Sequence, residues 1–241
     1  MDTIKIQKQQ TLAIAHRGLS SLERENSLAA FIAAGQRSYF GIETDVRVTS
    51  DGIFVLMHDK NTARVSPDDL EIGDCTYEQL SSVRLFGYDG KTPRADLRIP
   101  RLSDYIAVCR RYEKKAILEL KCNFTIEELQ KIIDEFKEQD YLDHVIFISF
   151  GLDNLLNIRK LLPDVPAQYL RSETDDAHAL INRMVEEHLD LDVSYTMITR
   201  EFVDECHAAG VLVNVWTVDN PETAAHMIEC GVDFLTTNRL E

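Results

Sequence analysis

The chain has 241 residues, of which 44% are hydrophobic and 28% are charged, and its formal net charge at pH 7 is −15. Such a composition is typical of a folded domain, and the strong acidity excludes nucleic acid and anionic membranes as expected partners, because both attract clustered Lys and Arg. The net charge does not exclude an anionic small molecule, which responds to the local charge of its site.

We expect neither a secretory signal nor a membrane span in this chain. Residues 1–10 contain no apolar stretch of the kind that forms a secretory signal, and no segment approaches the ~18 continuous apolar residues of a membrane span. The cysteines are odd in number and form no Cys-x-x-Cys pair: Cys75, Cys109, Cys122, Cys206 and Cys230. We therefore expect free thiols, a cytoplasmic location and no stable association with membranes.

Short apolar runs alternate with amphipathic patterns along the whole chain. Continuous apolar runs are typical of parallel strands that are buried on both faces, and they predict strands at 11–15, 41–48, 116–121, 144–150, 167–170, 191–194, 211–217 and 233–236. The intervening patterns predict helices at 27–36, 102–112, 126–138, 152–161, 175–187, 200–209 and 221–230. Pro221 after Asn220 indicates a helix start, and Gly210 and Gly231 indicate helix ends.

Eight strands that alternate with helices over about 250 residues favour a closed TIM (β/α)₈ barrel, with residues 1–241 as a single domain. An open, doubly wound sheet is the structural alternative. That fold usually has a glycine-rich turn after its first strand, whereas this chain has His16-Arg17-Gly18 there.

One region interrupts the alternation. Ser50-Asp51-Gly52 predicts a hairpin turn, and 53–57 predicts an antiparallel return strand that ends at His58. Residues 60–100 are then rich in Gly, Pro, Asp and Ser, with one short helical stretch near 77–83. We expect a small functional insertion at the barrel mouth, after the second strand.

Charged residues stand inside two of the apolar strands. Glu43 and Asp45 lie two apart and therefore point to the same face, and Glu119 and Lys121 repeat this arrangement on the next barrel strand. Buried carboxylates must be paired, coordinated or exposed to a wet pocket. They could form a buried salt-bridge network, but three converging carboxylates also suit a hard divalent cation such as Mg²⁺ or Ca²⁺ better than zinc.

The charge count of these strand ends favours the cation. Glu43, Asp45 and Glu119 supply three negative charges, and Arg17 and Lys121 supply two positive charges. A site that is net negative would repel a phosphate, whereas one divalent cation would make it net positive and suited to a phosphodiester.

Two histidines and a tryptophan complete the candidate site. His16 follows the first strand and His58 ends the return strand, so that a general base and a general acid for phosphoryl transfer would flank the metal. The sequence does not show which histidine has which role. Trp216, at the end of the seventh strand, either lines a pocket or fills the core.

The motifs that contain these residues resemble the glycerophosphodiester phosphodiesterase family, of the bacterial, cytosolic type. The resemblance extends in the right order over nearly the whole chain, through Ala15-His16-Arg17-Gly18, Glu25-Asn26-Ser27, Gly41-Ile42-Glu43-Thr44-Asp45-Val46, Thr49-Ser50-Asp51-Gly52, Val55-Leu56-Met57-His58-Asp59, Ile99-Pro100-Arg101-Leu102, Leu118-Glu119-Leu120-Lys121 and Val215-Trp216-Thr217-Val218.

The resemblance implies a TIM barrel with a small insertion after its second strand, and a phosphoric diester hydrolase of glycerophospholipid and glycerol metabolism. It implies the hydrolysis of glycerophosphodiesters to glycerol 3-phosphate and an alcohol such as choline or ethanolamine. By residue, it implies an acid/base pair of His16 and His58, metal ligands Glu43, Asp45 and Glu119, and phosphate-binding cations Arg17 and Lys121.

Two departures from the family pattern concern the loops. The chain has Arg24-Glu25-Asn26-Ser27 where the family often has Pro-Glu-Asn-Thr, and Thr237-Asn238 where the last strand commonly ends in Thr-Asp. Neither departure removes a proposed catalytic group, so we expect them to affect the pocket rim and substrate preference more than the chemistry.

Two other functions are compatible with the same residues. A phospholipase-type phosphodiesterase acting on lysophospholipids or inositol lipids would need a route onto membranes, and the sequence shows neither a basic patch nor an amphipathic anchor. A non-catalytic protein that binds phosphodiesters or senses a metal would not need two proton-transfer groups.

Overall fold

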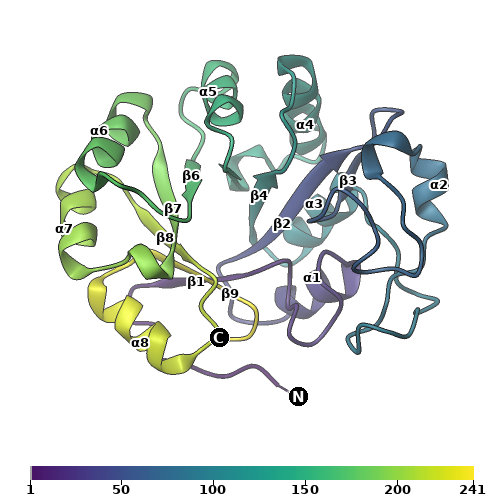
Figure 1. Cartoon of the computed structure of the whole chain (residues 1–241), viewed down its shortest axis with the longest axis horizontal. Coiled ribbons are helices and arrows are strands. Elements are labelled where there is room, and N and C mark those ends of the chain that lie inside the picture. The colour runs from purple at the N-terminus through teal and green to yellow at the C-terminus, as the bar shows by residue number, and fades with distance from the viewer. Residues whose placement is uncertain (1) are drawn as a thin grey trace.

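Eight parallel strands close into a barrel in the computed structural model, which describes residues 2–241 (Figure 1). The strands follow the order β1-β9-β8-β7-β6-β5-β4-β2, and an additional pairing of β1 with β2 closes the sheet. Their bounds are β1 (Leu12–Ala15), β2 (Gly41–Val48), β4 (Lys115–Leu120), β5 (Val145–Ser149), β6 (Ala167–Arg171), β7 (Asp190–Ser194), β8 (Val213–Trp216) and β9 (Phe234–Thr237). The predicted TIM barrel is confirmed, and the open-sheet alternative is wrong because β1 pairs on both of its edges.

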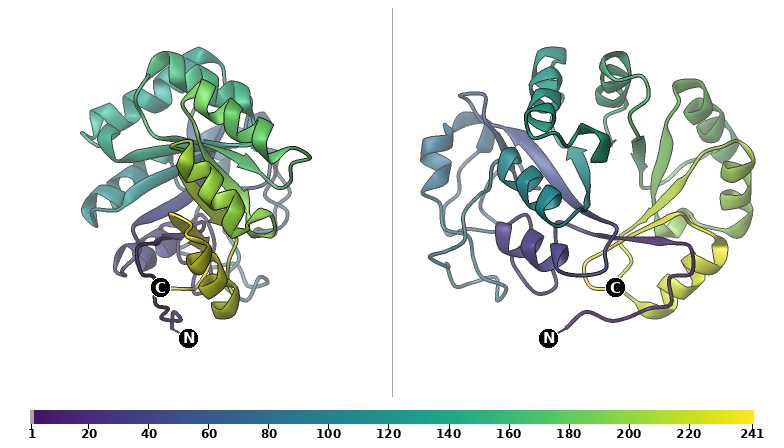
Figure 2. Two further views of the ribbon diagram at one scale, coloured as in Figure 1. Left: turned by 90° about the vertical axis from the view of Figure 1, so that its left-hand side faces the viewer. Right: turned by 180° about the vertical axis from the view of Figure 1, so that it is seen from behind.

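Seven helices surround the barrel on its outside, as the three views in Figures 1 and 2 show. They are α1 (Leu28–Gly35), α3 (Leu102–Arg111), α4 (Ile126–Glu138), α5 (Leu152–Leu161), α6 (Ala177–Glu187), α7 (Arg200–Ala208) and α8 (Pro221–Cys230). The predicted helices agree with these to within two residues at each end, because side-chain caps mark the boundaries locally. Asn220, for example, accepts hydrogen bonds from the backbone N–H groups of Glu222 and Thr223 at the start of α8.

The insertion after the second barrel strand is also present. β3 (Phe54–Leu56) pairs antiparallel with β2, and the following segment contains the 3₁₀ turn η1 (Ile72–Asp74) and the short helix α2 (Tyr77–Ser81). Two more 3₁₀ turns, η2 (Leu142–His144) and η3 (Tyr195–Met197), lie elsewhere. Buried side chains of the insertion form their own small apolar cluster: Val55, Met57, Val65, Ile72, Cys75, Leu80, Val83, Leu85, Leu97 and Ile99. This separate cluster explains how a region rich in turn residues holds a defined shape beside the barrel.

The barrel interior is layered from apolar to polar. Ile14, Ile117, Ile146 and Phe234 belong to one buried interior cluster. A hydrogen-bonded row follows, in which Thr236 donates to Asn214 and Asn214 donates to Gln168. Four charged residues are also buried on the barrel strands: Glu43, Asp45, Glu119 and Asp192. His16 and Lys121 directly follow the carboxyl ends of β1 and β4. Active sites of TIM barrels form at this end of the strands.

Two expectations about the whole chain can be compared with the structure. All five cysteines are free thiols, as predicted. Within residues 2–241, no helix has both the length and the apolar character needed to cross a bilayer.

Tyr105 on α3 contacts both β2 and α1. Its fully buried hydroxyl group on α3 donates a 2.6 Å hydrogen bond to the backbone oxygen of Ile42 in β2. Its ring also packs edge-to-face on Phe31 of α1, with centroids 5.1 Å apart. A buried backbone oxygen that loses such a donor is costly.

We therefore expect Tyr105→Phe to lower the free energy of unfolding by about 1–3 kcal/mol, measured by urea denaturation. Tyr88→Phe is the matched control, because the Tyr88 side chain is 52% exposed. Equal stability of the two variants would contradict a structural role for the Tyr105 hydroxyl.

Candidate active site

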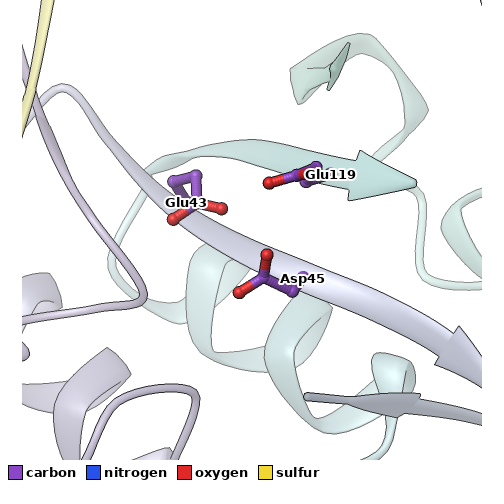
Figure 3. A group of neighbouring side chains, drawn as sticks. All are labelled: Glu43, Asp45 and Glu119. Atoms are coloured by element: carbon purple, nitrogen blue, oxygen red, sulfur yellow. The ribbon is translucent and has the colours of Figure 1, made fainter. Parts of the chain in front are cut away.

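Three acidic side chains converge at the carboxyl ends of β2 and β4. Glu43 and Asp45 lie on β2, and Asp45 pairs in register with Glu119 on the neighbouring strand. Figure 3 shows the three carboxyl groups on the same face of these strands, and one oxygen of each lies within 4.8 Å of the others. Their exposed fractions are 2%, 0% and 8%. The two-residue spacing therefore brought Glu43 and Asp45 to one place, as expected from strand geometry.

Two cations contact this acidic cluster but do not balance it. Lys121 Nζ lies 2.8 Å from Glu119 and 3.5 Å from Asp45, and Arg17 Nε lies 3.5 Å from Asp45. No lysine or arginine side chain of residues 2–241 forms an ion pair with Glu43. A self-contained salt-bridge network would neutralise every acid, and this one leaves an acid without a cation.

The pKa shifts of the cluster have the same origin. Burial, followed by the charges of Asp45 and Glu119, raises the pKa of Glu43 well above its usual range. Burial and Asp45 raise the pKa of Glu119 to about 7. Burial alone would also raise the pKa of Asp45, but Arg17 and Lys121 lower it. The carboxyl groups thus compete with one another for too little positive charge.

The turn after β1 has a backbone that positions His16 and Arg17. Arg17 and Gly18 both adopt positive φ angles, of 54° and 75°. A Cβ atom on Gly18 would come within 2.7 Å of the Ala30 backbone, so only glycine fits there. The turn directs the Arg17 backbone N–H to Glu43 Oε2, at 2.7 Å. Local geometry therefore requires Gly18, and the turn also presents a backbone N–H to the acidic cluster.

His16 is held by an amide whose orientation is fixed. Asn238 Nδ2 donates to Asp219 at 2.5 Å, which leaves Asn238 Oδ1 to accept from His16 Nδ1 at 2.8 Å. Because Nδ1 carries the proton in this network, the Nε2 atom of the neutral ring has a free lone pair. His16 Nε2 lies 4.0 Å from Glu43 Oε2. Burial and the Arg17 charge lower the pKa of His16 to about 4.

His58 has a different partner. Its Nδ1 atom lies 2.8 Å from Asp59 Oδ1, and the ring is half-buried at the end of the return strand. Burial lowers the pKa of His58, while Asp45 and Asp59 act in the opposite direction. One candidate histidine is thus bound to a neutral amide and the other to a carboxylate.

A chain of ion pairs connects the two histidine-bearing segments. Asp59 binds Arg64 Nε at 2.6 Å, and Arg64 forms a bidentate pair with Glu25 at 2.7 and 2.8 Å. Glu25 also accepts from Arg17 at 2.8 Å. Since Arg64 belongs to the insertion, this chain attaches the insertion to the loop after β1.

A cavity of about 470 Å³, including the part open to solvent, lies beside the acidic cluster and the two histidines. His16, His58, Glu43, Glu119 and the two cations line one side, and the other residues of its lining include Ile148, Phe150, Leu170, Asp192 and Trp216. The sequence did not decide whether Trp216 lines a pocket or fills the core. The structure places it in the cavity lining, edge-to-face with Phe150 at 5.7 Å.

Several residues of this region were not found from the sequence. Asn238 was expected to affect the pocket rim and substrate preference more than the chemistry, but it contacts His16 directly. Glu25 and Asp59 stood in recognised motifs without a role, and nothing in the sequence pointed to Arg64. Asp192 did carry a signal, because an acid in the middle of an apolar strand is unusual.

A TIM barrel with carboxylates, cations and imidazoles in one cavity at the carboxyl ends of its strands belongs to the class of barrel enzymes that act on anionic substrates. Comparison with known proteins identifies the class more closely. The model of the glycerophosphoryl diester phosphodiesterase family matches residues 16–241. The chain belongs to this family and is a phosphoric diester hydrolase.

Individual relatives agree with the family assignment. A glycerophosphodiester phosphodiesterase of Caldanaerobacter subterraneus is 32% identical over 234 residues, which cover 95% of this chain and 94% of the relative. The structure of an Oleispira antarctica phosphodiesterase, in complex with the product sn-glycerol-3-phosphate, has a TM-score of 0.85 at 27% identity and covers 94% of this chain and 92% of that one. A glycerophosphodiester phosphodiesterase from Parabacteroides distasonis has a TM-score of 0.80 at 27% identity, with coverage of 96% and 94%.

Glu25→Gln tests the chain of ion pairs. Although burial opposes it, the bonds from Arg64 and Arg17 lower the pKa of Glu25 from 4.5 to about 2. A lowered folded-state pKa stabilises the fold above the unfolded value, and this stabilisation disappears as pH falls through the folded value. We expect the substitution to cost roughly 2 kcal/mol of unfolding free energy at pH 7.

Urea denaturation at several pH values would measure this cost. The difference between the wild type and Glu25→Gln should narrow as pH falls from 4.5 towards 2. Glu173→Gln, at an exposed position, serves as the control. A difference that stays constant over this pH range would contradict the proposed stabilisation.

Asn238→Ala tests the orientation of His16. Removal of the amide oxygen should allow the proton to move to Nε2, and ¹⁵N chemical shifts of the imidazole in histidine-labelled protein would report this change. Ser20→Ala is the matched control. It removes the Ser20 hydroxyl, which also donates to Asn238 Oδ1, but keeps the Asn238 amide and its hydrogen bond to Asp219. An unchanged His16 tautomer in Asn238→Ala would show that the amide does not fix it.

Proposed function

We propose that this enzyme hydrolyses glycerophosphodiesters to glycerol 3-phosphate and an alcohol, with one divalent cation, Mg²⁺ or Ca²⁺, as cofactor. One observation carries the proposal. A buried cluster of three acids, contacted by only two cationic side chains, adjoins a cavity that is also lined by two imidazoles, one bonded to an amide and the other to a carboxylate. The phosphodiester substrate is a small molecule, in keeping with the modest size of the cavity.

The residues present fit a hard cation. Glu43, Asp45 and Glu119 offer only oxygen ligands, and Asp45 Oδ1 is buried without a hydrogen-bond partner among the described residues. Oxygen ligands of this kind are preferred by Mg²⁺ and Ca²⁺. When bound, the cation would supply positive charge to the phosphoryl oxygens and polarise the phosphorus for attack.

Arg17 and Lys121 are proposed to bind the phosphate of the substrate. Both side chains are mostly buried, contact the acidic cluster and line the cavity. A fixed cation in such a partly dehydrated site stabilises charge that develops on a phosphoryl oxygen in the transition state. Trp216 is proposed as a substrate-binding residue on the apolar side of the cavity.

His16 is proposed as the general base. The free lone pair at Nε2 can accept a proton from the attacking hydroxyl group, whether this belongs to water or to the substrate. A pKa of about 4 keeps the ring neutral near pH 7, which is the state a base requires.

His58 is proposed as the general acid. Burial lowers the pKa of His58 and opposes the charged imidazolium, whereas a carboxylate that accepts from Nδ1 favours it, and Asp59 occupies this position. The Nε2 proton of the imidazolium can then pass to the oxygen of the leaving alcohol. The two histidines have these separate roles because one is bound by an amide and the other by a carboxylate.

A comparison of two leaving groups tests these roles. Glycerophosphocholine releases an alkoxide that needs a proton, whereas the p-nitrophenyl ester of glycerol 3-phosphate releases a stable phenolate. We expect His16→Ala to lose at least ~10²-fold in kcat on both substrates. We expect His58→Ala to lose as much on glycerophosphocholine but less than ~10-fold on the p-nitrophenyl ester.

Controls define what would contradict the assignment. His178→Ala, in an exposed helix, should behave as wild type. Removal of divalent cations by a chelator should abolish turnover, and Mg²⁺ or Ca²⁺ should restore it. Equal losses of His58→Ala on the two substrates would contradict its role as acid, and full activity without metal would contradict the cofactor.

A further inference from the structure

Asp192 lies on the wall of the cavity opposite the acidic cluster. β7 is separated from β2 by three strands in either direction around the barrel, so the two strands face each other across it. The Asp192 side chain lines the cavity and is only 2% exposed. The acidic cluster lies on β2 and β4, and His16 and His58 follow β1 and β3.

The carboxyl group of Asp192 has an unsatisfied oxygen. Its Oδ1 atom is buried and has no hydrogen-bond partner among residues 2–241. The indole N–H of Trp216 donates to the Asp192 backbone oxygen, at 3.2 Å, and not to its carboxyl group. Buried polar groups without partners cost free energy, and active-site pockets are where such groups persist because a ligand completes them.

The neighbouring strands do not complete it. Leu170 on β6 and Asn214 on β8 are the register partners of Asp192. Leu170 is apolar, and the Asn214 amide is already bound to Gln168 and Thr236, at 3.1 Å each. The hydrogen-bonded row inside the barrel therefore does not include Asp192, although its strand, β7, lies between β6 and β8.

The charge around Asp192 restricts what can bind there. No ion pair joins it to a cation in the described part of the chain, and burial together with Glu119 raises the pKa of its carboxyl group well above the usual range. A group in this environment suits a neutral partner such as a hydroxyl group, with which a carboxylic acid can both donate and accept. It does not suit a phosphate, which Arg17 and Lys121 attract to the other wall.

We propose that Asp192 binds a hydroxyl group of the glycerol part of the substrate, and so selects phosphodiesters that carry free hydroxyl groups. This inference rests on the proposed function. Ile148 and Leu170, which are buried beside it in the lining, provide apolar contacts for the glycerol carbons. The alcohol headgroup of the diester would then lie in the outer part of the cavity, near Phe150, which is 47% exposed.

Kinetics on two diesters would test this subsite. Glycerophosphocholine has glycerol hydroxyl groups, and bis(p-nitrophenyl) phosphate has none. We expect Asp192→Leu to lower kcat/KM for glycerophosphocholine by about 10- to 100-fold and to change kcat/KM for bis(p-nitrophenyl) phosphate by less than about 3-fold. Asp192→Asn, which keeps a carbonyl oxygen, should retain more activity on glycerophosphocholine. Asp175→Leu, the same substitution at an exposed position outside the cavity lining, should leave kcat/KM for both substrates at the wild-type level.

Other outcomes would overturn the inference in distinct ways. Equal losses of Asp192→Leu on both substrates would show a structural role, and no loss on either would show that Asp192 does not meet the substrate. A loss limited to choline and ethanolamine diesters, and absent with glycerophosphoinositol, would place Asp192 at the headgroup. A wild-type enzyme that cleaves bis(p-nitrophenyl) phosphate but no glycerophosphodiester would instead contradict the proposed function, and the subsite with it.

Discussion

The acidic cluster of Glu43, Asp45 and Glu119 is the constraint on which the rest of the site depends. Carboxyl groups buried together inside a barrel raise one another's pKa and oppose folding unless positive charge reaches them. Arg17 and Lys121 supply part of that charge at distances of 2.8–3.5 Å. The turn at Gly18 adds a backbone N–H for Glu43. The remaining negative charge suits the site to a cation and, through it, to an anionic substrate.

The same constraint explains why loops far apart in sequence are attached to one another. The cations can neutralise buried acids only if they are held still, and Arg17 is held by Glu25, which in turn binds Arg64 of the insertion. Arg64 also binds Asp59, beside His58. The insertion therefore contributes to the site although it contains only short elements. Its own apolar cluster supplies the rigidity that this attachment requires.

The cavity has two chemically different sides, and this difference arises from the order of strands around the barrel. β1, β2 and β4 are adjacent and carry the groups proposed to hold metal and phosphate. β5 to β8 and the residues that follow them supply a mostly apolar and aromatic lining, in which Asp192 is an acid. A substrate with a charged centre and a hydroxyl-bearing arm matches such a division. Specificity in this arrangement comes from the side of the cavity that takes no part in the proposed proton transfers.

The sequence by itself determined the alternation of strands and helices, the hairpin after β2, and the shared face of Glu43 and Asp45, because each depends on a periodicity or turn within a few residues. It also carried the family motifs. Only the tertiary structure decided that Asn238 meets His16, from 222 residues away, that Arg64 joins Glu25, and that Trp216 lines the cavity. It likewise left the Oδ1 atom of Asp192 without a hydrogen-bond partner among residues 2–241. Such pairings depend on how the barrel closes, and no local pattern encodes which side chains then face each other.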